Sequence, residues 1–207
     1  MDSFKSIIQR LKLNLSNELP GASAQARMAP TLRSDLHLHA NPDSTTRQSA
    51  VLIPVFAYEG LASTLLIRRT TYNGVHSGQI SFPGGKQEEH DTDLIQTALR
   101  EAQEEVGIDP TLVKVVGTLT PLYIPVSNMM VLPVVGVMPS IKKLHLNLQE
   151  VEYTITARLS LFKNPDNFSV KTICINKQPI SAPFYTIGKE EVWGATAMII
   201  SELTELY

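Results

Sequence analysis

The sequence predicts a single layered domain of the α/β or α+β class, and three observations support that prediction. Strand-like and helix-like stretches are interspersed along the chain, as in folds that pack helices against a sheet. The chain has 207 residues, of which 43% are hydrophobic and 18% charged, so it can bury a core of ordinary size. No repeat or linker divides it, apart from a connector at residues 21–49 that is rich in Ala, Ser, Thr and Pro.

The first predicted element is an amphipathic N-terminal helix that ends near residues 20–21. Apolar residues recur there at i, i+3, i+4, i+7 and i+11, the spacing of one helix face. We expect this helix and the connector, residues 1–49, to pack on a main domain of residues 50–207. In the connector, His37 and His39 share one side of an extended stretch; without a third ligand nearby, a polar strand face is expected rather than a metal site. The apolar helix positions are Phe4, Ile7, Ile8, Leu11 and Leu15.

From residue 50 onward the pattern changes to strands. Glu59-Gly60 marks the first turn, and residues 70–79 form a polar loop. A short strand then ends at Pro83-Gly84-Gly85, where the glycines allow the backbone to pass close to another group. The predicted strands are residues 50–58, 64–68, 80–82, 113–119, 129–137, 153–159 and 171–175.

Two helices are predicted in the main domain. The first runs from near residue 91 to residue 106, and Gly107 is positioned to end it. The second covers about residues 192–206, and Trp193 at its start is expected to belong to the core.

Charge and cysteine content exclude several classes of protein. The formal net charge is −2 and the pI is about 6.2, which argues against a general nucleic-acid-binding face. The single cysteine, Cys174, excludes an internal disulfide, suits a reducing compartment and is expected to be buried as a small apolar residue. No apolar run approaches the ~20 residues that span a bilayer, and the N-terminus lacks the apolar centre of a signal peptide. We therefore expect a cytoplasmic enzyme without nucleic-acid or membrane partners.

The helix at residues 91–106 carries the side chains that suggest chemistry. With Glu101 set at zero, Glu105 falls at about 40° and Glu104 at about 300° around the helix, so three carboxylates share an arc of about 100°. Such crowding is unfavourable unless a divalent cation relieves it, and oxygen ligands suit Mg²⁺ or Mn²⁺. Arg100 lies one turn before Glu104 and can orient it. The alternative interpretation is an ordinary solvated acidic helix.

Together with the glycines that precede it, this helix resembles the Nudix box, the loop–helix–loop signature of Nudix hydrolases. The family pattern is Gly, five residues, Glu, seven residues, Arg-Glu, an aliphatic residue, any residue, Glu-Glu, any residue, Gly and an aliphatic residue. Here fourteen residues separate Gly85 from Arg100 where the pattern has thirteen, and Asp91 or Thr92 stands in place of the early Glu. The resemblance implies an α/β/α sandwich with a central mixed β-sheet and a catalytic loop–helix–loop. The matching residues are Gly85, Arg100, Glu101, Ala102, Glu104, Glu105, Gly107 and Ile108.

The residues before the box resemble those of Nudix enzymes that cleave coenzyme A. Their pattern is Leu-Leu-Thr, any residue, Arg, Ser or Ala, three residues, Arg, three residues, Gly, three residues and Phe-Pro-Gly-Gly. The chain departs from it at Ile67, Thr70 and Gly74, and Gly74 stands where the pattern has its second Arg. The start of the last helix, residues 193–197, is also similar to this subfamily. The matching residues are Leu65, Leu66, Arg69, Gly78, Phe82, Pro83, Gly84 and Gly85.

The resemblance implies a metal-dependent hydrolase that cleaves the diphosphate of a nucleoside diphosphate joined to another group. Glu101, Glu104 and Glu105 would hold Mg²⁺ or Mn²⁺, and Glu104, positioned by Arg100, would accept a proton from the attacking water. A glutamate outside the box is the alternative proton acceptor. The candidates for that alternative are Glu150, Glu152, Glu190 and Glu191.

For the substrate, the resemblance implies coenzyme A or a derivative, with 3′,5′-ADP and 4′-phosphopantetheine as products. One alternative is a Nudix hydrolase of ADP-ribose, NADH or a similar compound, and another is a non-catalytic module that binds a nucleotide. A homodimer is common in the family. The Ser127-Asn128 loop is either a substrate contact or an ordinary turn. The residues expected to bind the substrate are Arg69, Gly84, Gly85 and Lys86.

Overall fold

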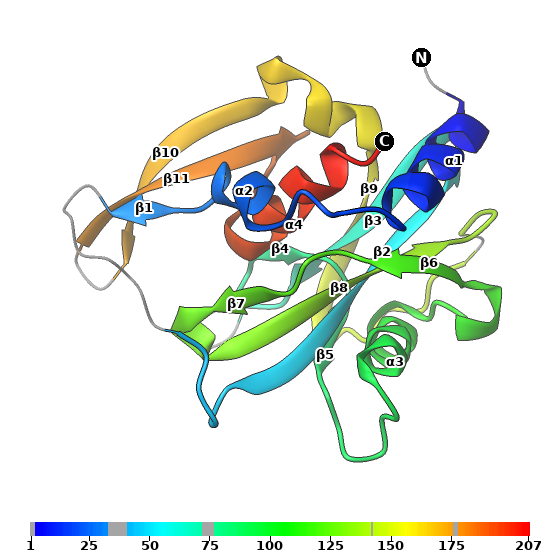
Figure 1. Cartoon of the computed structure of the whole chain (residues 1–207), viewed down its shortest axis with the longest axis horizontal. Helices are drawn as coiled ribbons and strands as arrows, with labels where there is room; N and C mark the ends of the chain where they lie inside the picture. Colours follow the sequence, from blue (N-terminus) through cyan, green and yellow to red (C-terminus); the bar gives the residue numbers. More distant parts are fainter. Residues whose placement is uncertain (1–2, 33–40, 72–76, 142, 176–177) are drawn as a thin grey trace.

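The computed structural model describes residues 3–32, 41–71, 77–141, 143–175 and 178–207, and it shows a large β-sheet between helices (Figure 1). Five strands follow the order β4-β3-β2-β8-β6, while β5 also pairs with β2, β7 with β8 and β9 with β3. Because β2 and β8 run parallel and the other pairs antiparallel, the sheet is mixed, as predicted. Its strands are β2 (Arg47–Tyr58), β3 (Leu61–Arg69), β4 (Ile80–Ser81), β5 (Gly84–Lys86), β6 (Lys114–Thr118), β7 (Leu122–Ile124), β8 (Met129–Val137) and β9 (Val151–Arg158).

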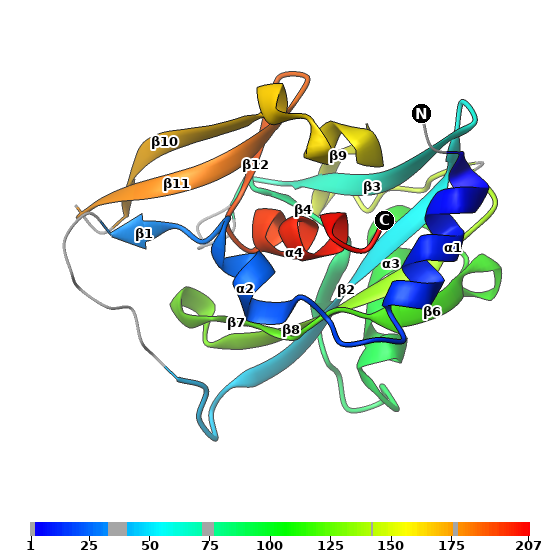
Figure 2. The same cartoon turned by 45° about the horizontal axis from the view of Figure 1, so that its top comes forward.

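Two apolar clusters cover the two faces of this sheet. In β2 the alternation of a strand sends Leu52 to one face and Ile53 to the other. Leu52 packs in the cluster of α3 (Leu94–Val106), whereas Ile53 packs in the cluster of α1 (Phe4–Asn14) and α4 (Gly194–Thr204). Figures 1 and 2 show these helices around the sheet. The predicted α/β/α arrangement is therefore confirmed.

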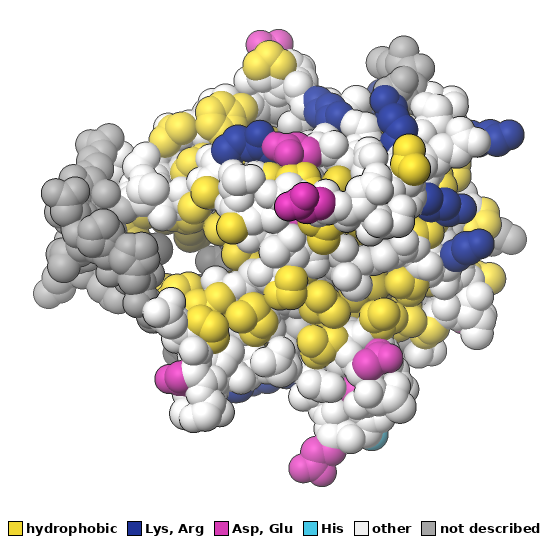
Figure 3. Space-filling view, viewed as in Figure 1, with side chains coloured by type: hydrophobic (Ala, Val, Ile, Leu, Met, Phe, Trp, Pro, Cys, Tyr) yellow, Lys and Arg dark blue, Asp and Glu magenta, His cyan; other side chains and the backbone are white. Residues whose placement is uncertain are grey.

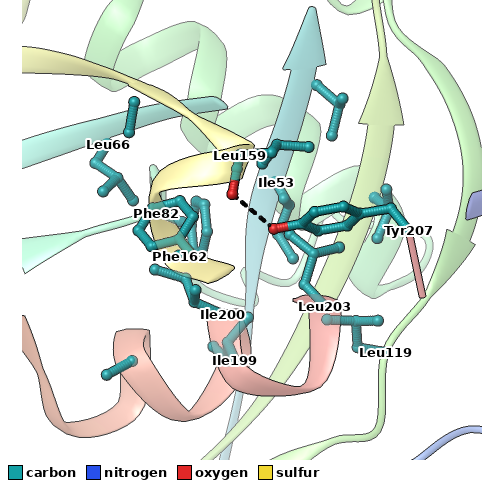
Figure 4. Packing of buried hydrophobic residues seen from close by; sticks show 14 of the residues in the cluster. Ile53, Leu66, Phe82, Leu119, Leu159, Phe162, Ile199, Ile200, Leu203 and Tyr207 are labelled. Atoms are coloured by element: carbon teal, nitrogen blue, oxygen red, sulfur yellow. Dashed lines mark hydrogen bonds between the residues drawn. The ribbon is translucent and has the colours of Figure 1, made fainter. Parts of the chain in front are cut away.

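The cluster on the α4 face includes the last residues of the chain (Figure 4). Tyr207 is buried, and its hydroxyl donates a hydrogen bond to the carbonyl oxygen of Leu159 over 2.9 Å. At the other end of α4, the hydroxyl of Thr196 donates to the carbonyl oxygen of Ile80 over 3.0 Å. Because β4 precedes the two glycines of the box, this packing fixes the approach of the chain to that loop.

A second sheet of four strands stands beside the first and was not predicted as a separate unit. Its strand β11 contains Pro179 and Pro183, which interrupt the strand pattern in the sequence. Within the described residues β10 pairs only with β11, and Phe168 and Val170 on it are exposed. Cys174 is exposed as well, so the prediction of a buried thiol is wrong. The strands are β1 (Thr31–Leu32), β10 (Phe168–Ile175), β11 (Gln178–Ile187) and β12 (Glu190–Trp193).

The N-terminal segment packs on the α4 face of the molecule. Helix α1 buries one side, as predicted from its periodicity, and α2 (Gly21–Ala26) packs on α4. Lys5 and Lys12 lie on the exposed side of α1, and Figure 3 shows Lys and Arg side chains gathered around this helix. The buried residues of α1 are Ile7, Ile8 and Leu11.

His37, His39 and Gly74 lie outside the described residues. Within the described ranges, the structure contains no helix that is both long and apolar enough to cross a bilayer.

A buried carboxylate on α4 ties the N-terminal segment to the domain. Glu202 is 0% exposed. Its Oε1 accepts hydrogen bonds from the backbone N–H of Gly21 (3.2 Å) and from both the backbone N–H (3.2 Å) and the hydroxyl (2.7 Å) of Thr120. Its Oε2 accepts a hydrogen bond from Gln25 over 2.9 Å. A buried charge is costly unless it is hydrogen-bonded, and here α2 and Thr120 each supply two donors.

We expect Glu202→Gln to lower the free energy of unfolding by about 2 kcal/mol, because the amide turns a donor toward groups that are themselves donors. Urea denaturation followed by circular dichroism measures the change. The matched control is Glu205→Gln, three residues on, where the glutamate pairs with Arg27 at the surface. That change is expected to stay within about 0.5 kcal/mol. Equal losses of stability in the two variants would contradict this role for Glu202.

Candidate active site

Caps at both ends hold helix α3 in place. At its start, Oδ1 of Asp93 accepts the backbone N–H of Gln96 over 2.8 Å, so the helix begins at residue 94 and not at 91. At its end, Gly107 adopts a left-handed conformation (φ 73°), as the sequence predicts. The inner face packs on the sheet, and the acidic arc beside it therefore lies where the core meets solvent. The inner face is Ala98, Ala102 and Val106, all 0% exposed.

The two glycines of the loop before α3 leave room for the backbone to pass through a narrow space. A Cβ atom on Gly84 would lie 2.4 Å from the carbonyl oxygen of Ala50 in β2. A Cβ atom on Gly85 would lie 2.4 Å from the carboxylate of Glu101. A side chain at Gly84 would meet the backbone of β2, and one at Gly85 would displace the Glu101 carboxylate, so the Gly-Gly pair allows strand β5 to lie between β2 and the acidic face of α3.

Glu105 is the most deeply buried carboxylate of the acidic arc, with 1% exposure. Its Oε2 accepts the backbone N–H of Gly84 over 2.9 Å, and its Oε1 accepts a hydrogen bond from Nη1 of Arg69 over 3.2 Å. Burial raises the pKa of Glu105 to about 7, although Arg69 and the Gly84 N–H favour the charged form. The negative charges of Glu101 and Glu150 raise this pKa further.

Arg100 organises the outer part of the site. Its Nε and Nη2 each donate to a different carboxylate oxygen of Asp91, both over 2.9 Å. Its Nη1 donates to Glu101 (3.1 Å) and to Glu104 (2.9 Å), and its Nη2 also reaches the carbonyl oxygen of Lys86 (3.0 Å). The bidentate pair with Arg100 holds the pKa of Asp91 well below its usual range, despite burial.

The irregular spacing of the box left Asp91 and Thr92 as alternatives for the early acid. The structure distinguishes the two positions. The side chain of Asp91 is buried and also accepts the hydroxyl of Thr97 and the backbone N–H of Glu88, both over 2.9 Å. The backbone N–H of Asp91 donates to the carbonyl oxygen of Glu88 over 3.0 Å and closes a tight turn before α3.

The three carboxylates of α3 fit a divalent cation by their charge and their surroundings. Burial raises the pKa of Glu101 as it does that of Glu105, and mutual repulsion adds to both shifts. Glu104 is 57% exposed. Arginines hold these side chains, and within the described residues no three acidic, His or Cys side chains form a ready-made metal cluster. A cation that draws the carboxylates together would relieve the repulsion, and hard oxygen donors suit Mg²⁺ or Mn²⁺.

The structure brings some of the predicted substrate contacts to this site. Arg69, Gly84 and Gly85 all touch a carboxylate of the arc or border it. Lys86 is exposed. Its backbone carbonyl oxygen contacts the site by accepting a hydrogen bond from Arg100. Trp193 is half-buried at the start of α4 rather than deep in the core.

Ser127 and Asn128 lie at the end of a short 3-10 helix, Pro125–Ser127. Asn128 is left-handed (φ 45°) and accepts hydrogen bonds from the hydroxyls of Tyr123 (3.0 Å) and Thr46 (2.9 Å). These contacts join the start of β2 to the β7–β8 connection.

The four glutamates outside the box lie in different places. Only Glu150 acts on the box: its charge raises the pKa of both Glu101 and Glu105. Glu190 accepts hydrogen bonds from Arg68 (3.3 Å) and Tyr153 (2.7 Å). The remaining two also pair elsewhere, Glu152 with Arg68 at 3.9 Å and Glu191 with Lys171.

Comparison with known proteins agrees with the class that this helix and loop define: the chain belongs to the Nudix hydrolase family, enzymes that hydrolyse diphosphate bonds. The NUDIX domain family matches residues 46–144. Among its relatives is an uncharacterized Nudix hydrolase, NudL, of Pectobacterium atrosepticum, 36% identical over 179 residues that cover 86% of this chain and 88% of the relative. NudL of Yersinia pestis is 37% identical over 168 residues, which cover 78% and 80%. Nudix hydrolases generally use divalent metal ions and act on small nucleoside diphosphate compounds.

Solved structures that are similar to this chain include a Caenorhabditis elegans Ap4A hydrolase binary complex, with a TM-score of 0.47 and 18% identity over 55% of this chain and 81% of that one. The NUDIX domain of Shewanella oneidensis NrtR, complexed with ADP ribose, has a TM-score of 0.46 and 18% identity over 59% of this chain and 80% of that one.

Proposed function

We propose that the protein hydrolyses the diphosphate of coenzyme A or its derivatives to 3′,5′-ADP and 4′-phosphopantetheine. The observation that carries this proposal is the contact between Arg69 and Glu105. Arg69 belongs to the pattern that resembles coenzyme A-cleaving enzymes, whereas Glu105 belongs to the box. A contact between the two motifs supports a single site, in which Arg69 binds the substrate and Glu105 is one of the carboxylates that would hold the cation.

In this proposal the carboxylates of Glu101, Glu104 and Glu105 would hold Mg²⁺ or Mn²⁺, and the bound cation would supply charge neutralisation of the diphosphate and activation of water. Arg100, fixed by Asp91, orients Glu101 and Glu104. Glu104 is one candidate for the proton acceptor.

The substrate contacts in this proposal come from the segment around strand β5. The guanidinium of Arg69 suits bidentate contact with a phosphate group. Because Gly84 and Gly85 have no side chains, the substrate can approach the backbone closely there. The side chain of Lys86 supplies a further positive charge.

The test is a panel of diphosphates incubated with the full chain and Mg²⁺ or Mn²⁺, with products resolved by chromatography. We expect the highest kcat/KM for coenzyme A or a thioester of it, with equal amounts of the two products. A preference for ADP-ribose or NADH would support diphosphate hydrolysis but contradict coenzyme A as the substrate. Binding of nucleotides without turnover of any diphosphate would favour the non-catalytic alternative.

We also infer a cytoplasmic location and a homodimer for the working enzyme. The exposed thiol of Cys174 suits a reducing compartment. Size-exclusion chromatography with light scattering tests the oligomeric state.

A further inference from the structure

The carboxylate of Glu105 is held by two groups that come from neighbouring strands of the main sheet. Nη1 of Arg69, at the end of β3, and the backbone N–H of Gly84, at the start of β5, each donate a hydrogen bond to it. Both groups follow the short stretch in which β3 pairs with the edge strand β4, where Arg68 stands opposite Ile80. The place of the Glu105 carboxylate therefore depends on what holds these two strands.

Helix α4 holds the edge strand β4. The hydroxyl of Thr196 is buried and donates to the carbonyl oxygen of Ile80 over 3.0 Å, while among the described strands β4 pairs only with β3. From Ile80 to Gly84 the chain has little freedom. The side chain of Phe82 is buried, and the carbonyl oxygen of Pro83 accepts a backbone N–H of β2 over 2.8 Å. A shift of β4 is therefore passed on to the Gly84 N–H.

Strand β12, which directly precedes α4, holds the end of β3. Glu190 in β12 accepts hydrogen bonds from Nη1 of Arg68 over 3.3 Å and from the hydroxyl of Tyr153 in β9 over 2.7 Å. Because Glu190 is buried, its carboxylate needs these donors, and their places are fixed to it. Arg68 directly precedes Arg69. Strand β12 and the start of α4 thus hold β3 at Arg68 and β4 at Ile80, two residues that stand opposite each other.

We propose that Thr196 and Glu190 are positioning residues of the active site, which act on the Glu105 carboxylate through β4 and β3. The inference rests on the proposed diphosphate hydrolysis and goes beyond it, because neither residue belongs to the box or to the pattern before it. Thr196 holds the strand that leads to the Gly84 N–H, and Glu190 holds the strand that carries Arg69. Each contact ends at a different oxygen of Glu105, Oε2 for Gly84 and Oε1 for Arg69.

The first experiment compares Thr196→Val with Ser201→Ala in the full chain. Both residues are buried in α4 and donate through a hydroxyl to a backbone carbonyl oxygen, but Ser201 donates to Ala24 in α2 rather than to β4. We expect Thr196→Val to speed the hydrogen exchange of the Gly84 N–H, measured by NMR, roughly tenfold relative to the backbone N–H groups of β8. Ser201→Ala is expected to leave this ratio unchanged, and Thr196→Ser, which keeps the hydroxyl, to restore it.

The same variants are then tested on whichever diphosphate the wild-type protein hydrolyses best. Thr196→Val is expected to lower kcat roughly tenfold with a smaller change in KM, because a small displacement of a reacting group is costly. Its affinity for Mn²⁺, measured by calorimetry, is expected to fall roughly tenfold as well. Thr196→Ser and Ser201→Ala are expected to keep wild-type kcat and Mn²⁺ affinity.

Glu190→Gln tests the contact with β3. The amide removes the charge partner of Arg68 and leaves one oxygen where the carboxylate had two, so kcat is expected to fall roughly fivefold. In an Arg69→Gln background the same change is expected to have no further effect on kcat, since Glu190 acts through that guanidinium. The control is Glu205→Gln, which breaks an ion pair at the surface and is expected to keep wild-type kcat.

Wild-type hydrogen exchange at Gly84, or wild-type kcat, in Thr196→Val overturns the role of Thr196. Equal effects of Thr196→Val and Ser201→Ala overturn it too, because they would show only a loss of stability. For Glu190, a further loss of kcat in the Arg69→Gln background has the same meaning. A wild-type protein that hydrolyses no diphosphate overturns the proposed function, whereas hydrogen exchange and Mn²⁺ calorimetry still decide the positioning role, so the two failures are distinguishable.

Discussion

Replacing Glu105 with Gln is expected to lower cation-dependent diphosphate hydrolysis by roughly three orders of magnitude, since several kcal/mol of charge stabilisation depend on its carboxylate. In the proposed mechanism the substitution removes one of the three carboxylates that would hold the cation. It also disturbs the neighbours, because both oxygens of Glu105 accept hydrogen bonds and the new amide would point a donor at either Gly84 or Arg69. Steady-state kinetics with coenzyme A, together with calorimetric titration of Mn²⁺, measures both effects.

The control for this prediction is Glu59→Gln. Glu59 also pairs with an arginine, Arg158 at 2.6 Å, but it lies at the exposed β2–β3 turn away from α3. That variant is expected to keep wild-type kcat and Mn²⁺ affinity. Circular dichroism shows whether Glu105→Gln is folded. A folded Glu105→Gln protein with the wild-type rate would falsify the assignment of the site.

The catalytic helix could be predicted from the sequence because its determinants are local. The 3.6-residue period places Ala98, Ala102 and Val106 on one face, and Gly107 supplies the left-handed end. The position of the acidic arc follows from this periodicity alone. Its pairing with Gly84 does not, because that contact depends on β5 lying across β2.

The contacts of Asp91 could not be predicted by counting residues along the chain. Spacing alone left Asp91 and Thr92 equivalent, since the loop has one residue more than the family pattern. Three-dimensional contacts separate them: the turn at Glu88 directs the Asp91 carboxylate toward Arg100. Loop geometry of this kind depends on hydrogen bonds between residues that have no fixed sequence offset.

The rest of the fold could not be predicted in detail, because it depends on contacts between segments that are far apart in the sequence. The second sheet pairs β11 with β1, about 150 residues apart in the chain, and no local pattern encodes such a pairing. Cys174 lies among apolar residues, which indicates a buried strand, yet β10 is at an edge and exposes that side chain. The place of Glu150 could not be distinguished from those of the other three glutamates outside the box, because only the folded chain brings its loop to the end of α3.

Replacing Gly85 with Ala is expected to lower kcat/KM by roughly 100-fold to 1,000-fold while leaving the fold intact. The new methyl group would lie 2.4 Å from the Glu101 carboxylate, so that carboxylate must move. Because the obstacle is the end of a flexible side chain and not backbone, the sheet can stay in place. Glu101 would carry with it the hydrogen bond from Arg100 (3.1 Å), so the displacement disturbs two groups of the site. Kinetics at increasing Mn²⁺ concentration measures the effect, and excess Mn²⁺ is expected to recover part of the activity.

The matched control for Gly85→Ala is Gly60→Ala. Gly60 has a positive φ of 76° and no atom within 4 Å of the position of a new Cβ, so the change strains the backbone without touching another group. It is expected to cost about 1 kcal/mol of stability and to leave kcat/KM unchanged. The two variants thus separate loss of stability from loss of carboxylate position. If Gly85→Ala retained full activity and wild-type Mn²⁺ affinity, Glu101 would not need the space that the glycine provides, and its place among the cation ligands would have to be given up.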